Sequence, residues 1–98
     1  MKMKNLNIIT VCGFGVGSSM VLKMKVDEIL KEEGITAKVS TSDVGSAAST
    51  PCDVIFTSNE LGEKLSQTAS VPVVMVKNFI DKNEIKEKGL PVIQSLLS

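Results

Sequence analysis

Near its N-terminus the sequence reads Val11-Cys12-Gly13-Phe14-Gly15-Val16-Gly17-Ser18-Ser19. The short apolar run 6–11 that leads into this stretch predicts a buried strand, and the amphipathic run 20–33 that follows it predicts a helix. A cysteine therefore stands where a strand ends and three glycines form the turn. Ser18 or Ser19 is expected to cap the helix.

This glycine-rich turn has the properties of an anion-binding site. Glycine tolerates positive φ and lets a ligand approach the backbone closely. The N–H groups of such a turn converge, and the start of a helix adds about half a positive charge, so a phosphate fits well. A helix start also lowers the pKa of a cysteine thiol from ~8.5 to roughly 3.5–7.5. We therefore predict that Cys12 is a thiolate nucleophile and that its phosphate is bound by Gly13, Phe14, Gly15, Val16, Gly17, Ser18 and Ser19.

The rest of the chain alternates between strand-like and helix-like segments. In the first helix, Leu22, Val26, Ile29 and Leu30 recur at helical spacing and are expected to face the sheet, and Gly34 is expected to end the helix. The downstream patterns predict strands over 35–41, 53–57 and 71–76. Between them they predict one helical turn within 42–48 and a helix over 58–67 with Leu61 and Leu65 inward. Asp81 is expected to cap a last helix, which Gly89 and Pro91 are positioned to interrupt.

This alternation predicts an α/β fold, a small doubly wound parallel sheet of four strands in the order 2-1-3-4. Helices are expected to flank the sheet and the chain to form a single domain over 1–98. Ligands of such sheets bind beyond the carboxyl ends of the strands, where the Cys12 turn is expected to lie. The other polar residues expected at strand ends on this side are Thr41, Ser42, Asp43, Thr57, Ser58, Asn59, Lys77 and Asn78.

Composition narrows the range of functions. The chain has 98 residues, its 11 lysines balance 11 acidic residues, and Trp and Tyr are absent, so we predict no nucleic-acid partner. No apolar run approaches the ~20 residues that span a bilayer, and no signal-peptide core is present, so we expect a cytoplasmic protein that is not itself membrane-spanning. The chain also lacks His and Arg, which removes a Cys–His dyad and histidine metal ligands. We predict no metal and no cofactor.

Other motifs built around glycine or cysteine fit the turn less well. A dinucleotide-binding motif needs a third glycine where this chain has Ser18 or Met20, and a Walker A motif needs Gly-Lys-Ser/Thr. A Cys-x5-Arg phosphatase needs an arginine where Ser18 stands. A lone cysteine at a strand end is often only a small buried residue, and this interpretation of Cys12 stays open. It is the expected role of Cys52, which lies at the opposite edge of the predicted sheet, too far from Cys12 for a disulfide.

Two methionines point away from the predicted apolar face of the first helix. Met20 and Met24 lie about 160–200° from Leu22 and Val26 at 100° per residue. They either fill the flank of the helix or form a docking surface beside the turn. The other candidates for such a surface are Phe14 and the loop that carries Lys77 and Asn78.

The pattern Cys12-Gly13-x-Gly15-x-Gly17-Ser18-Ser19-Met20, followed by Lys23-Met24-Lys25-Val26-Asp27, resembles a known family. It is similar to the IIB components of the bacterial phosphoenolpyruvate-dependent sugar phosphotransferase system (PTS), most of all the ascorbate type, with the lactose and galactitol types as near relatives. Phe14 and Val16 stand where the ascorbate branch has more polar residues, which leaves the sugar open.

The resemblance implies a phosphotransferase component of the protein-phosphohistidine–sugar class. Cys12 would accept a phosphoryl group from a phosphohistidine on a IIA protein. The resulting phosphocysteine would pass it to a sugar, ascorbate-like or another carbohydrate, held by the IIC membrane permease. Two other classes stay open from the residues alone. One is a phosphatase or arsenate-reductase-like enzyme, and the other is a non-catalytic anion-binding module.

Overall fold

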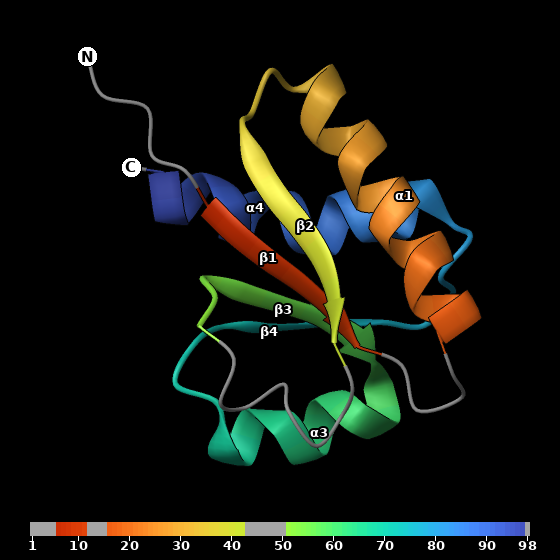
Figure 1. Cartoon of the computed structure of the whole chain (residues 1–98), viewed down its shortest axis with the longest axis vertical. Helices are drawn as coiled ribbons and strands as arrows, with labels where there is room; N and C mark the ends of the chain where they lie inside the picture. The colour runs from red at the N-terminus through yellow and green to blue at the C-terminus, as the bar shows by residue number, and fades with distance from the viewer. Residues whose placement is uncertain (1–5, 12–15, 43–50, 98) are drawn as a thin grey trace.

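The computed structural model describes residues 6–11, 16–42 and 51–97, with the side chains of 16–19 and 97 left out (Figure 1). The elements follow in the order β1 (Leu6–Val11), α1 (Val16–Glu32), β2 (Ala37–Ser42), β3 (Val54–Ser58), α3 (Asn59–Thr68), β4 (Val73–Val76) and α4 (Lys82–Leu97). Short strands thus alternate with longer helices, except between β2 and β3, where the predicted helical turn within 42–48 lies almost wholly outside the described residues.

The four strands form one parallel sheet in the order β2-β1-β3-β4, which confirms the predicted topology. β1 lies inside the sheet, and its last residue, Val11, stands opposite Ser42 of β2 and Thr57 of β3. The polar β2 occupies an edge, as predicted. The segment that contains Cys12 therefore leaves the sheet from an inner strand, at the edge where the carboxyl ends of the strands meet.

Helices cover both faces of the sheet (Figure 1). The larger apolar cluster, between the sheet and the helices α1 and α4, contains all four predicted α1 residues, Leu22, Val26, Ile29 and Leu30. The smaller cluster, under α3, contains Ile9, Val11, Ile55 and Leu65, with Leu61 packed against it. Because successive strand residues point to opposite faces, β1 supplies side chains to both clusters and is held from both sides.

Three ion pairs also join α1, and Glu33 just after it, to the first half of α4. Lys82 pairs with Glu28, at 3.6 Å, and with Glu32, and Lys86 pairs with Glu33 at 3.2 Å. These side chains are partly exposed, so the pairs add little to stability. The apolar cluster beneath them holds the two helices together.

The start of α1 differs from the prediction. The helix begins at Val16, so Ser18 and Ser19 lie inside its first turn and neither is the N-cap. The first turn is made of Val, Gly and Ser, which give no periodic apolar signal. The sequence pattern therefore detects the helix only from Met20, near the first buried residue, Leu22.

The end of α1 confirms the role of Gly34, which adopts φ 69°. The N–H of Ile35 donates to the Leu30 carbonyl at 2.9 Å, and the N–H of Gly34 donates to the Lys31 carbonyl at 3.2 Å. This pair of bonds is a Schellman motif, and Ile35 packs on the apolar cluster that contains Leu30. Because Ile35 is engaged there, β2 starts at Ala37, two residues later than predicted.

The predicted cap Asp81 is confirmed, whereas Ser58, predicted as the first residue of a helix, is the N-cap that precedes it. Ser58 is the N-cap of α3, and its hydroxyl accepts the Leu61 N–H at 3.4 Å. Asp81 caps α4, accepting the N–H of Glu84 on its carboxylate at 3.2 Å and that of Ile85 on its carbonyl at 3.1 Å.

The predicted interruption of α4 is wrong, because the helix runs unbroken from Lys82 to Leu97 with Pro91 inside it. Proline removes one helical hydrogen bond, but Ile85 and Ile93 are both buried and hold the two halves of the helix on the sheet. Gly89 lies against the ring of Phe56 on β3. A Cβ at this position would lie 2.4 Å from Cε2 of that ring, so the glycine allows the close approach of helix and sheet.

We expect Gly89→Ala to destabilise the protein although alanine favours helices by ~1 kcal/mol. Overpacking against the Phe56 ring costs about 1–3 kcal/mol, so the free energy of unfolding in a urea titration should fall. Adding Phe56→Leu should couple to this loss, with the double variant less destabilised than the sum of the single variants. Additive single effects, or a Gly89→Ala protein as stable as wild type, would contradict this packing argument.

Candidate functional site

Only the two ends of the predicted phosphate-binding segment lie among the described residues. Cys12, Gly13, Phe14 and Gly15 lie outside the described residues. Val11, which precedes Cys12, is fully buried at the end of β1, and Val16 begins α1. The predicted phosphate-binding segment therefore starts from a buried inner strand and ends in a helix.

The start of α1 supplies backbone donors. In any helix the first N–H groups have no intrahelical acceptor, which here concerns Val16, Gly17 and Ser18. These amides and the positive end of the helix dipole suit an anion. Of the predicted phosphate-binding residues, Val16 to Ser19 thus belong to a helix terminus and not to a loop. That they bind phosphate stays a prediction.

A buried threonine holds the last carbonyl of β1. The Thr57 hydroxyl, on the neighbouring strand β3, donates to the Val11 carbonyl at 3.0 Å, and the side chain is fully buried. The sequence marked Thr57 only as a polar strand end. The hydrogen bond depends on the β1–β3 register, which places Thr57 beside Val11 and which a single sequence does not reveal.

The loop between β4 and α4, which carries Lys77 and Asn78, is held by a carboxylate. Glu84 accepts the backbone N–H of Lys77 at 2.7 Å and that of Asn78 at 2.9 Å, one on each oxygen. Lys88 donates to the same carboxylate at 2.7 Å. The hydrogen bond from Lys88 contributes most to lowering the pKa of the Glu84 carboxyl below its usual value, and the two backbone amides lower it further. Sequence reasoning missed Glu84, although an acid in the first turn of a helix is a recognised capping signal.

A shallow cavity of about 230 Å³ opens at the same edge of the sheet. It is lined by the last residue of β3, the first two of α3, and the last residue of β4 with the one after it, namely Ser58, Asn59, Glu60, Val76 and Lys77. The sequence placed Ser58, Asn59 and Lys77 at this edge, and the structure brings them together around one cavity.

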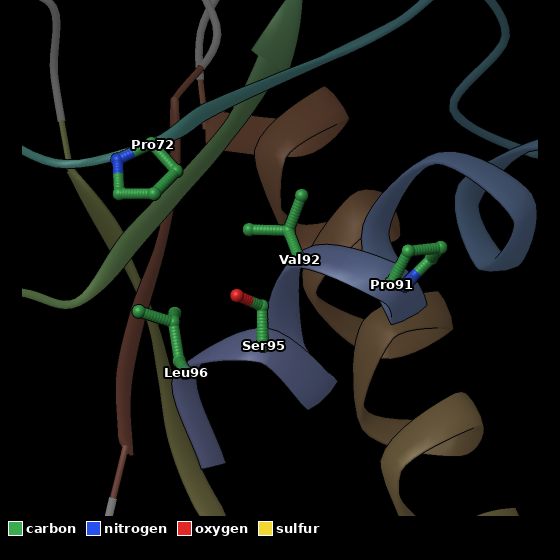
Figure 2. Close-up of a pocket in the computed structure, with 5 residues that line it drawn as sticks. All are labelled: Pro72, Pro91, Val92, Ser95 and Leu96. Atoms are coloured by element: carbon green, nitrogen blue, oxygen red, sulfur yellow. The ribbon is translucent and has the colours of Figure 1, made fainter. Parts of the chain in front are cut away.

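A second cavity, of about 330 Å³, lies away from this edge. Figure 2 shows Pro72, just before β4, facing Pro91, Val92, Ser95 and Leu96 of α4. Pro72 precedes β4, so this cavity is at the amino end of the strand, and its lining is almost entirely apolar. It offers no charged group for phosphate chemistry.

Large apolar side chains are exposed on α1 and on the β4–α4 loop. Met20 and Met24 are 46% and 57% exposed, one helical turn apart, and Ile80 is 68% exposed. Exposure of this size does not fit a role as filler on the flank of the helix, and it favours the docking-surface interpretation. Ile80 was not identified from the sequence, because an isolated apolar residue in a loop carries no pattern.

Cys52 lies at the amino edge, as predicted. It directly precedes Asp53, whose N–H donates to the Asn7 carbonyl and whose carboxylate accepts the Asn7 N–H, both at 2.7 Å. The pKa of the Cys52 thiol is raised above its usual value, mainly by burial and to a smaller extent by the negative charge of Asp53. Cys52 also packs against the apolar cluster under α3, which agrees with the structural role predicted for it.

Neither a metal centre nor a membrane span is found in the described part of the chain. Over 6–11, 16–42 and 51–97 no three His, Cys, Asp or Glu residues gather closely enough to bind a metal ion. Within the same ranges, no helix combines the length and apolarity that crossing a bilayer requires.

Comparison with known proteins yields consistent matches. Residues 7–89 match the family model described as "PTS system, Lactose/Cellobiose specific IIB subunit". The chain is 42% identical over 89 residues to an ascorbate-specific PTS system EIIB component of Mycoplasma pneumoniae, covering 89% of this chain and 94% of that protein. It is 36% identical over 91 residues to the protein of that name from Salmonella typhimurium, with 91% and 90% covered.

The fold is also shared with a solved structure. The lactose-specific IIB component domain from Streptococcus pneumoniae aligns with a TM-score of 0.61 over 96% of both chains, at 14% sequence identity. At this identity the likeness supports the fold alone.

We expect Glu84→Gln to loosen the β4–α4 loop, because a neutral amide has one acceptor oxygen where the carboxylate has two. Hydrogen exchange at the amides of Lys77 and Asn78 should become faster at pH 7, whereas Glu87→Gln on the exposed side of α4 should leave it unchanged. Since the pKa of Glu84 is lowered in the folded state, its contribution is complete above the unfolded value of 4.5. It should disappear as the pH falls through the folded value. Unchanged exchange in Glu84→Gln would contradict the proposed clamp.

We expect Cys12 to be alkylated faster than Cys52 at pH 7. Its pH midpoint should lie below the free-thiol value of ~8.5 because of the helix terminus, whereas that of Cys52 should lie above it. Iodoacetamide labelling, resolved by peptide mass spectrometry across a pH series, measures both in one sample. Equal rates for the two thiols would favour a merely structural Cys12.

Proposed function

This chain belongs to the IIB subunit family of the sugar phosphotransferase system, and we propose that Cys12 is the residue that carries its phosphoryl group. As a IIB protein it is a phosphotransferase component, a phosphoryl carrier in sugar uptake. The observation that supports Cys12 is its position. It directly follows Val11, the buried end of an inner strand, and stands four residues before the start of α1.

The proposed reaction has two displacements at phosphorus. The Cys12 thiolate attacks a phosphohistidine on IIA whose other ring nitrogen carries a proton. An S–P bond forms while the N–P bond breaks, and the histidine leaves as a neutral imidazole. A sugar hydroxyl then attacks the phosphocysteine, so an O–P bond forms, the thiolate leaves and the hydroxyl proton passes to a base or water. Catalysis of such steps rests on positioning and electrostatics. Gly13 to Ser19 would supply the amides that bind the phosphoryl oxygens.

The donor and the acceptor must reach the same sulfur in turn. We propose that IIA and then the IIC permease dock on one surface, formed by Phe14, Met20, Met24 and the loop with Lys77, Asn78 and Ile80. Its support is the exposure of Met20, Met24 and Ile80. Methionine adapts to more than one partner. We propose that the carrier works in the cytoplasm, at the inner face of the permease.

We propose an ascorbate-like substrate. The relatives that are 36–42% identical over about nine-tenths of the chain are ascorbate-specific by name. The lactose-specific neighbour is only 14% identical, although the matching family model is described by lactose and cellobiose. Ascorbate, lactose and cellobiose are therefore the three substrates to compare.

The first test is the site of phosphorylation. The protein is incubated with phosphoenolpyruvate, the general phosphotransfer proteins and an ascorbate-type IIA, and the modified peptide is identified by mass spectrometry. In the wild-type protein we expect phosphate on Cys12. The Cys12→Ser variant should carry no phosphate at position 12, and the matched control Cys52→Ser should be phosphorylated normally. Phosphate on another residue would refute the assignment, and release as fast as loading without sugar would indicate a phosphatase.

The second test is the acceptor. Phosphorylated protein is mixed in parallel with vesicles that contain an ascorbate-type, a lactose-type or a cellobiose-type IIC permease, and loss of phosphate from Cys12 is followed after the matching sugar is added. Ascorbate should discharge the protein, whereas lactose and cellobiose should not. Discharge by lactose or cellobiose alone would overturn the substrate assignment and leave the carrier role intact.

A further inference from the structure

Thr57 is one of two polar side chains that are fully buried among the described residues, the other being Thr10. Thr57 lies on β3, opposite Val11, and its hydroxyl donates to the Val11 carbonyl at 3.0 Å. Valine has nearly the same shape and suits a buried strand at least as well. A buried hydroxyl is unfavourable unless it makes a hydrogen bond, so what distinguishes threonine at this position is its contact with the end of β1.

The contact acts on the peptide group that leads into Cys12. A peptide group is planar, so the oxygen of Val11 and the nitrogen and Cα of the next residue share one plane. Holding that oxygen therefore orients the backbone from which Cys12 extends. The Thr57 side chain is itself stiff, because β-branched residues in strands have restricted χ1 angles.

Val11 is restrained a second time through its side chain. It is fully buried in the apolar cluster under α3, with Ile55 and Leu65. The side chain and the carbonyl of the same residue are thus both held, one by packing and one by the hydroxyl.

We infer that Thr57 is a positioning residue for Cys12, because its hydroxyl orients the peptide group through which the chain passes from Val11 to Cys12. The inference rests on the proposed function of Cys12. In-line attack at phosphorus is sensitive to placement, since an error of about 1 Å can cost ~100-fold in rate. Thr57 touches neither donor nor acceptor in this scheme and acts only through the backbone of Val11.

The test compares three variants. Thr57→Val keeps the volume and removes the hydroxyl, and Thr57→Ser keeps the hydroxyl and removes the methyl group. Thr68→Val is the matched control, because the Thr68 hydroxyl also donates to a carbonyl, that of Leu65 at 3.4 Å, but at the end of α3. Melting temperatures are recorded first, and all kinetics are measured where each protein is folded.

Two readouts are used. The first is the rate at which phosphorylated IIA loads Cys12, which we expect to fall about ten-fold or more in Thr57→Val. The second is the pH midpoint of Cys12 alkylation, which we expect to rise in Thr57→Val because the sulfur is displaced from the amides and dipole that favour the thiolate. Thr57→Ser should restore both values, Thr68→Val should change neither, and the alkylation of Cys52 should be the same in all four proteins.

The outcomes separate this inference from the proposed function. If folded Thr57→Val loads and titrates like wild type, or if Thr57→Ser is as impaired as Thr57→Val, the hydroxyl does not position Cys12 and the inference is overturned. If wild type is not phosphorylated on Cys12, the proposed function fails. The alkylation midpoints still decide in that case whether Thr57 controls the thiol.

Discussion

β1 is paired with β2 on one side and with β3 on the other, up to and including its last residue, Val11. Its side chains also enter both apolar clusters, so the strand is restrained in the plane of the sheet and across it. A chain segment that leaves such a strand starts from a defined position and direction. The predicted site depends on this restraint, because a nucleophile that meets two partners in succession must present its sulfur in the same way to both.

Much of this arrangement could be predicted from local patterns. Strand order, the buried face of α1, the stop at Gly34 and the cap at Asp81 follow from periodicity and from residues with strong conformational preferences. The contacts that could not be predicted join residues far apart in the sequence. Gly89 and Pro91 predict an interrupted helix, and only the position of the Phe56 ring explains why a glycine stands in a continuous one. Likewise, the hydrogen bond from Thr57 to Val11 follows only from the register.

The sequence predicts what kind of site to expect better than it predicts which residues belong to a helix and which to a loop. A cysteine before a glycine-rich turn predicts phosphoryl transfer, and for Cys12 this stays a prediction. The beginning of α1 decides which amides belong to a helix terminus, and it lies two residues before Ser18. Because the chain has no Arg, the charge of a bound phosphate must be met by N–H groups, the helix dipole or Lys. Backbone donors suit a carrier, since they stabilise the phosphoryl group without supplying an acid or base that would activate water.

The Glu84 carboxylate has a bearing on how a partner binds. It holds the Lys77 and Asn78 amides from within the same chain, so the backbone of the β4–α4 loop is already ordered before anything docks. A partner that contacts this loop then loses little conformational entropy in ordering it, and little reorganisation slows the encounter or the separation. Preorganisation of this kind allows a small, short-lived interface to be specific. A protein that must release one partner before it can serve the next has more use for fast exchange than for high affinity.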